Sequence, residues 1–218
     1  MITLENLATV MDHFAVDTIP TYPARPINGG PLEHALPKNG KWFYEGKFND
    51  WRSLVHIPAG HMWNRQGERL TIENEFRIAL GTLRSTLAAG AFKWADCATL
   101  GRRHKVGKGS LIVLDVVPEP AFRSAGYEER RSWLETVLPT LGARCVPNAD
   151  SLYLPANTLE TDFGDLAGAW TALQEWNKVV GCDFYEGFVA KRAGSPYPMQ
   201  LQSPDKAFAF WVKHRWTF

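Results

Sequence analysis

The segment YEGKFNDWR, residues 44–52, places Lys47 at the end of an aromatic stretch that has the pattern of a buried strand. Glu45 lies two residues before the lysine, Asn49-Asp50 follows it, and Arg52 closes the segment. Because lysine is rarely buried without a partner, its amine either reaches water or has a chemical task. An Asn-Asp pair favours a tight reversal, so we expect it to join two strands of a hairpin.

Outward from this segment, the sequence predicts short strands and amphipathic helices. Strand patterns occur at 41–47, 51–58, 61–72, 91–100, 110–117, 151–155, 184–192 and 207–215. Helical spacing of apolar residues occurs at 1–16, 73–90, 127–138 and 165–181, and two of these helices end at Gly90 and Gly181. Because hairpins come first and no βαβ rhythm follows, we expect an α+β fold with antiparallel sheets flanked by helices.

The whole chain, 1–218, is expected to form a single domain. Its length and its 45% of hydrophobic residues are enough to bury a substantial core. It contains no internal repeat, low-complexity tract or linker. Residues 1–40 are expected to form a helix and a loop rich in Pro and Gly that lead into the domain.

The charge and the cysteines limit the possible classes of protein. The formal net charge is +1, so no global basic field indicates nucleic acid, although basic residues cluster at 102–108 and 213–215. The three cysteines form neither a CxxC pair nor a disulfide framework, which favours a reducing, cytoplasmic setting. We expect no signal peptide, because residues 1–17 lack a basic segment followed by an apolar run, and no stretch approaches the roughly 20 apolar residues of a membrane span.

Several predicted strand ends carry ionisable residues within apolar surroundings. They are Glu45 and Lys47, Asp96, Asp115, Glu186 and Lys191, and Lys213 and Arg215. A single such residue is usually an edge side chain that extends to solvent. If the strand ends converge, however, they form a pocket of cations that bind phosphate oxygens and carboxylates that hold magnesium. A lysine among other cations and a metal can have its pKa lowered enough to attack phosphorus.

Six segments resemble, in the correct order, the motifs of the covalent nucleotidyltransferases, which comprise ATP-dependent polynucleotide ligases and mRNA capping enzymes. They are KFNDWR (47–52), WNRQG (63–67), WADCATLG (94–101), LIVLDVV (111–117), EGFVAK (186–191) and WVKHR (211–215). The first resembles the nucleophile motif Lys-x-Asp-Gly, and the fifth resembles Glu-Gly-x-Val-x-Lys. The resemblance spans about 40 to 215 and implies the fold of a ligase-type nucleotidyltransferase domain, which is ATP-grasp-like.

The resemblance also implies a mechanism. Lys47 would attack the α-phosphate of ATP, expel pyrophosphate and carry AMP, which would pass to a 5′-phosphate end of nicked DNA or RNA before a 3′-hydroxyl seals the strand. The implied catalytic residues are Lys47, Lys191 and Lys213. The implied nucleotide contacts are Glu45, Asn49, Arg52, Arg65, Asp96 and Arg215, and the implied ligands of Mg²⁺ or Mn²⁺ are Glu186 and Asp96.

The sequence departs from the family pattern at three places. Asn49-Asp50 stands where the family usually has Asp-Gly, and Ala98 stands where a glutamate is expected. Leu114 stands where an aromatic residue often stacks on the base. The missing glutamate bears on metal binding and activity, and Asp96 or Asp50 is a hypothetical replacement for it.

Ligases and capping enzymes usually carry a further domain, commonly an OB barrel, after the last motif. This sequence stops at Phe218, soon after Arg215, so we expect a minimal or shortened enzyme, or one whose partner supplies the lid. Two alternatives stay open beside the ligase reading. One is a GTP-dependent capping guanylyltransferase, and the other is a non-catalytic protein that binds nucleotides or nucleic-acid ends.

Overall fold

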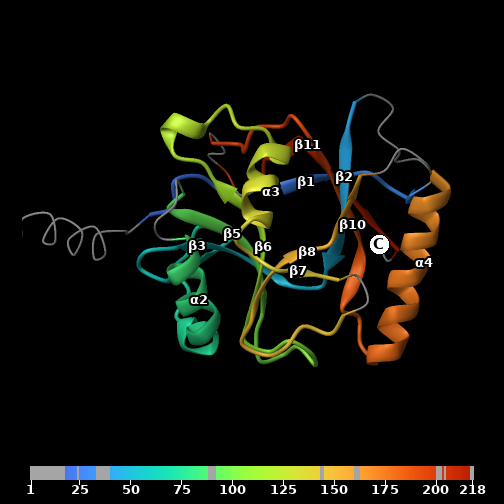
Figure 1. Cartoon of the computed structure of the whole chain (residues 1–218), viewed down its shortest axis with the longest axis horizontal. Coiled ribbons are helices and arrows are strands. Elements are labelled where there is room, and N and C mark those ends of the chain that lie inside the picture. The colour runs from blue at the N-terminus through green and yellow to red at the C-terminus, as the bar shows by residue number, and fades with distance from the viewer. Residues whose placement is uncertain are drawn as a thin grey trace, which may run out of the picture.

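The computed structural model describes residues 18–23, 25–32, 40–87, 92–142, 145–159, 163–199, 203 and 205–216. The helix expected at 1–16 and the helix end expected at Gly90 lie outside these ranges. The described residues form two β-sheets with helices packed against them (Figure 1). The α+β prediction is therefore confirmed.

The first sheet has five strands and includes the strand that carries Lys47. Its order is β1 (Arg25–Asn28), β11 (Ala207–Arg215), β10 (Tyr185–Arg192), β2 (Trp42–Phe48) and β9 (Asn157–Leu159). The second sheet has six strands in the order β4 (His61–Asn64), β3 (Trp51–His56), β5 (Trp94–Leu100), β6 (Ser110–Val117), β8 (Leu152–Pro155) and β7 (Thr140–Leu141). The central pairs are antiparallel as expected, whereas β1–β11, β6–β8 and β7–β8 are parallel.

Three α-helices of the described ranges cover the sheets. They are α2 (Arg77–Leu87), which follows the short 3₁₀ helix η2 (Glu73–Phe76), then α3 (Tyr127–Glu135), and α4 (Phe163–Val180); a second 3₁₀ turn, η3 (Pro120–Phe122), precedes α3. The apolar side of α2 is buried as its spacing predicts, and Gly181 ends α4 with a φ of 66°. None of the described helices has the length and apolar character needed to cross a bilayer.

The hairpin expected around Asn49-Asp50 is wrong, because β2 and β3 belong to different sheets. β2 pairs with β10 and β9, and β3 pairs with β4 and β5, so neither strand has an edge left for the other. The turn is fixed by the Asn49 backbone N–H, which donates to the Phe184 carbonyl at 2.9 Å. The chain thus crosses from one sheet to the other at this turn, which places Lys47 and Arg52 on different sheets.

A β-bulge in β10 sets the position of Glu186. Phe48 pairs with Tyr185 and Lys47 pairs with Gly187, so Glu186 is the extra residue on its strand. Gly187 has a φ of +144°, and a Cβ there would lie 1.8 Å from the His214 carbonyl oxygen. Only glycine fits this close approach of β10 to β11.

We therefore expect Gly187→Ala to lower the free energy of unfolding by at least about 3 kcal/mol, because the new methyl group meets backbone atoms at a strained φ. Urea unfolding measures the effect. The control is Gly168→Ala on α4, where nothing lies within 4 Å of the added Cβ; this variant should gain about 0.5 to 1 kcal/mol. Equal stability of Gly187→Ala and the wild type would contradict the role of this glycine.

Candidate active site

Strands of both sheets line a cavity of about 580 Å³ beside the crossing turn. Every site residue expected from the sequence lines it except Asp96: Glu45, Lys47, Asn49, Arg52, Arg65, Glu186, Lys191, Lys213 and Arg215. The two sheets therefore bring together residues that lie far apart in the sequence. Their roles in catalysis and binding stay predictions.

Lys47, Glu186 and Arg215 meet at one end of this cavity. In the sheet, Gly187 pairs with Lys47 on one side and with Arg215 on the other. The Lys47 ammonium donates to Glu186 Oε1, and Arg215 Nη2 lies 3.1 Å from the same oxygen. One carboxylate thus holds a lysine and an arginine from neighbouring strands.

Lys213 adds a further cation at this end. Burial lowers the pKa of its ammonium, and the positive charges of neighbouring residues lower it further. Those neighbours are Arg215, Arg25 and Lys47, while the Glu186 carboxylate acts in the opposite direction. The part of the lowering that comes from Arg215, Arg25 and Lys47 is repulsion between cations, which an anion placed among them would relieve.

Asp50, in the crossing turn, lines the same end of the cavity. Burial raises the pKa of its carboxyl to about 6, against the attraction of Lys47 and then of Arg52. The nearby negative charge of Glu186 also raises it. Asp50 and Glu186 are thus two close carboxyl groups at the wall that carries the lysine.

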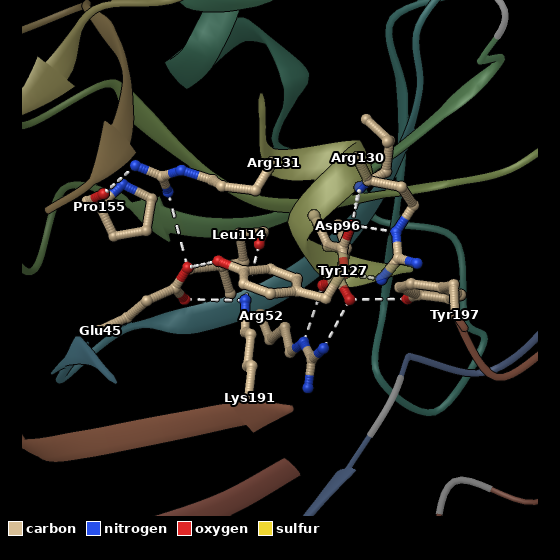
Figure 2. A network of polar contacts seen from close by, with 12 residues as sticks. Glu45, Arg52, Asp96, Leu114, Tyr127, Arg130, Arg131, Pro155, Lys191 and Tyr197 are labelled. Carbon is tan, nitrogen blue, oxygen red and sulfur yellow. Dashed lines mark hydrogen bonds and ion pairs between the residues drawn. The ribbon is translucent and has the colours of Figure 1, made fainter. Parts of the chain in front are cut away.

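Arg52 is held by a buried carboxylate, that of Asp96 (Figure 2). Its Nε donates to Asp96 Oδ1 at 2.7 Å, its Nη2 donates to Oδ2, and the Tyr197 hydroxyl donates to Oδ2 at 2.6 Å. Asp96 is 0% exposed. Burial disfavours the charged guanidinium, but Asp96 keeps the pKa of Arg52 above its ordinary value. In this structure Asp96 orients Arg52 rather than facing the cavity.

A second polar network surrounds Lys191 and Glu45, which are each 2% exposed (Figure 2). The Lys191 ammonium lies 2.8 Å from Glu45 Oε2 and donates to the Leu114 carbonyl at 2.7 Å. It also lies over the rings of Tyr127 and Trp211, at 4.7 and 4.4 Å from their centroids. These contacts balance the charge of Lys191. A phosphate bound by Lys191, as the sequence predicts, would have to compete with Glu45 and the Leu114 carbonyl for its ammonium.

Helix α3 supplies the other partners of Glu45, which sequence reasoning missed. The Tyr127 hydroxyl donates to Glu45 Oε1, and Arg131 Nη1 lies 3.5 Å from the same oxygen. Arg131 Nη2 also donates to the Pro155 carbonyl at 2.7 Å. The sequence around α3 reads as an ordinary amphipathic helix, so no local signal pointed to this role.

The residues present fit a magnesium ion that is shared with phosphate rather than caged by protein. No group of three or more His, Cys, Asp or Glu side chains within the described ranges is placed to hold a metal. Mg²⁺ is commonly bound by one or two carboxylates together with substrate phosphates, and Glu186 and Asp50 line the cavity. Both oxygens of Asp96 are already hydrogen-bonded, which leaves Glu186 as the better placed of the two expected ligands.

Comparison with known proteins supports the fold. No protein-family model matches the sequence, and a search of the curated proteins finds no match. Among solved structures, the ligase domain of M. tuberculosis LigD has a TM-score of 0.59 and 23% identity, over 89% of this chain and 59% of that one. A mycobacterial DNA ligase D complexed with ATP and MES has a TM-score of 0.58 and 22% identity, over 89% and 60%.

The Chlorella virus DNA ligase-adenylate is similar as well, with a TM-score of 0.56 and 10% identity over 90% of this chain and 68% of that one. This chain therefore has the fold of a ligase nucleotidyltransferase domain. It spans about 60% of the length of the two mycobacterial structures.

The Arg52–Asp96 pair gives a prediction about stability. Asp96→Asn should lower the free energy of unfolding by about 3 kcal/mol, because it leaves a largely buried guanidinium without its counter-charge. Tyr197→Phe, which removes one hydrogen bond, should cost about 1 kcal/mol. The control is Glu73→Gln, which breaks the more exposed pair with Arg69 and should cost less than about 0.5 kcal/mol. Urea unfolding of the three variants tests this order, and a neutral Asp96→Asn would refute it.

The raised pKa of Asp50 predicts a pH-dependent stability. Between its ordinary pKa of 3.8 and the folded value of about 6, the folded state holds a proton that the unfolded state has lost, so Asp50 lowers stability as the pH rises through this window. Asp50→Asn should therefore gain on the order of 2 kcal/mol at pH 7 and nothing below about pH 4. Unfolding at several pH values measures this, and a gain independent of pH would rule it out.

Proposed function

We propose that this chain is an ATP-dependent, ligase-like adenylyltransferase that acts on nucleic-acid ends through a covalent lysyl-AMP intermediate at Lys47. The observation that carries the proposal is the position of the Lys47 amine in the cavity, in contact with Glu186 and close to Lys213. A lysine among cations and a carboxylate is suited to attack phosphorus. The ligase fold gives the same reading independent support.

In the first step, the Lys47 amine attacks the α-phosphorus of ATP. The Lys47 ammonium passes one proton to the Glu186 carboxylate, with which it is already hydrogen-bonded, and the amine so formed loses its second proton to the departing pyrophosphate as it attacks. A bond forms between Nζ and phosphorus while the bond to the pyrophosphate oxygen breaks, so pyrophosphate leaves and AMP stays on the lysine as a phosphoramidate. Arg215 contacts the same carboxylate and keeps it beside the amine.

The neighbouring cations bind the phosphates. Lys213 and Arg215 lie at the Lys47 end of the cavity, where they neutralise the charge that develops on the α-phosphate. Arg52 and Arg65 line the wall formed by the second sheet and contact the ribose or the phosphates. Magnesium, held by Glu186 with Asp50 beside it, supplies further neutralisation of the phosphate oxygens when bound.

The base lies at the other end, against the paired Glu45 and Lys191. Leu114 and Trp211 line the cavity there and provide apolar surface for a purine. Because Lys191 is neutralised by Glu45, its role in this proposal is to fix the glutamate that meets the edge of the base. Asn49, in the crossing turn, keeps a side-chain oxygen for the ribose.

In the later steps, AMP passes from Lys47 to a 5′-phosphate of DNA or RNA, and a 3′-hydroxyl displaces it to seal the strand. A partner or a further domain that closes over the cavity belongs to the same proposal, since ligases orient the leaving pyrophosphate with a lid. A cytoplasmic location also belongs to it, and the three cysteines are free thiols.

A second candidate is a protein that binds nucleotides or nucleic-acid ends without chemistry. It is favoured by Ala98, which pairs with Arg52 in the sheet and brings a methyl group where a carboxylate was expected. A GTP-dependent capping guanylyltransferase would use the same lysine with another purine. The identity of the nucleotide that labels the protein separates this reading from the first.

The test is the intact mass of the protein after incubation with ATP and Mg²⁺ or Mn²⁺. We expect the wild type to gain the mass of one AMP moiety and release pyrophosphate. Lys47→Ala should gain nothing, and neither should Lys47→Arg, which keeps the positive charge beside Glu186 but cannot act as the nucleophile. A folded wild type that takes up neither AMP nor GMP would favour the binding protein instead.

A further inference from the structure

A second hollow, of about 820 Å³, lies next to the cavity. It is lined by the hairpin that joins β5 to β6 and by the C-terminal end of α4 with the residues that follow it, and we call it the hairpin groove. Its lining includes Arg103–Val106, Gln174, Asn177–Lys178 and Gly181–Phe184. Figure 1 shows the hairpin and this end of α4 at the same edge of the molecule. Asn49 lines both the groove and the cavity, so the two hollows adjoin at the crossing turn.

Two hydrogen bonds fix the hairpin in this position. Lys105 Nζ donates to the Gly181 carbonyl at 2.7 Å, which joins the hairpin to the end of α4. The His104 Nε2 and the Asn49 carbonyl oxygen lie 2.9 Å apart, which joins the hairpin to the crossing turn. The groove is therefore a built feature with a set position relative to Lys47.

The rim between the two hollows carries an aromatic ring and an arginine. Trp51 lines the cavity and is 50% exposed, and the Arg103 guanidinium lies 4.3 Å from the centre of its ring. An aromatic ring with a stacked arginine is the combination on which nucleic-acid bases stack without sequence preference.

The charge of the groove is positive. Arg103, Lys105 and Lys178 are exposed cations in its lining, and Asp183 is the carboxylate among the residues that line it. The whole chain has a net charge of only +1, so the surface as a whole is not basic and these cations are locally concentrated. Lysine and arginine side chains arranged along a groove bind the phosphates of a nucleic-acid backbone.

We propose that the hairpin groove binds the phosphodiester backbone of the nucleic-acid substrate next to its reacting end. Trp51 and Arg103 stack on the nucleotides that pass over the rim. This inference rests on the proposed ligase-like function and adds the path of the substrate to it. It assigns a function to Arg103 and Lys105 of the basic segment 102–108, which do not line the cavity.

The experiment measures binding of a nicked, 5′-phosphorylated DNA duplex and its RNA counterpart over a range of salt concentrations. The variant is Arg103→Glu with Lys178→Glu, which reverses two groove charges but leaves the Lys105 link intact. The matched control is Lys108→Glu, an exposed residue of the same hairpin that lines neither hollow. Formation of the AMP adduct at Lys47 is measured in parallel for all three proteins.

We expect the double variant to bind the preferred nucleic acid at least about 10-fold more weakly, with a salt dependence reduced by about two ions, while the control stays within about twofold of the wild type. Equal binding by the double variant and the control would overturn the groove, as would a wild type that binds neither nucleic acid. Either result counts against the groove only if the proteins compared still form the AMP adduct at Lys47. Failure of the wild type to form the adduct would refute the proposed function instead.

Discussion

Between Phe48 and Trp51 the chain leaves one sheet and enters the other, and the cavity depends on this crossing. A hairpin here would place Lys47 and Arg52 on one sheet. The crossing instead puts the lysine on a wall formed by β2, β10 and β11, and the arginine on a wall that continues into β5. The bulge at Glu186 and the absence of a side chain at Gly187 then bring the carboxylate to the lysine.

Buried ion pairs fix the side chains in the walls of the cavity, although removing the charged groups from water costs free energy. A buried pair gains less stability than its geometry suggests, but removal of one partner leaves an uncompensated charge. Arg52 with Asp96, and Lys191 with Glu45, are held in this way, and hydroxyl groups of Tyr197 and Tyr127 complete the carboxylates. Apolar side chains at these positions would avoid the cost of burying charges. We therefore infer that the networks serve to hold the side chains that face the cavity in position.

Local sequence patterns predicted most of the helices and strands. The features that they did not predict depend on contacts between segments that are distant in the sequence. Apolar spacing correctly located the helices near 77–87 and 127–135 and the paired strands of the central sheets. The Asn-Asp turn was predicted, but a turn does not specify which strands pair on either side of it. Asp96 was expected to contact the nucleotide and a metal ion, but its carboxylate is buried against Arg52 and Tyr197, and Tyr197 comes from a segment without strand or helix spacing. The short edge strands β1, β7 and β9 have no local signal because their pairing comes from neighbours elsewhere in the chain.

The charges that line the cavity are unevenly distributed between its two ends. At one end, Lys191 is balanced by Glu45 and lies between two aromatic rings, so that end is close to neutral. At the other end, Glu186 is shared by Lys47 and Arg215, and Lys213 stands beside them with a lowered pKa. This excess of cations favours a polyanion, while the neutral end favours a flat, uncharged ring. In the function that we propose, a nucleoside triphosphate would meet both conditions in one orientation, with its α-phosphate nearest Lys47.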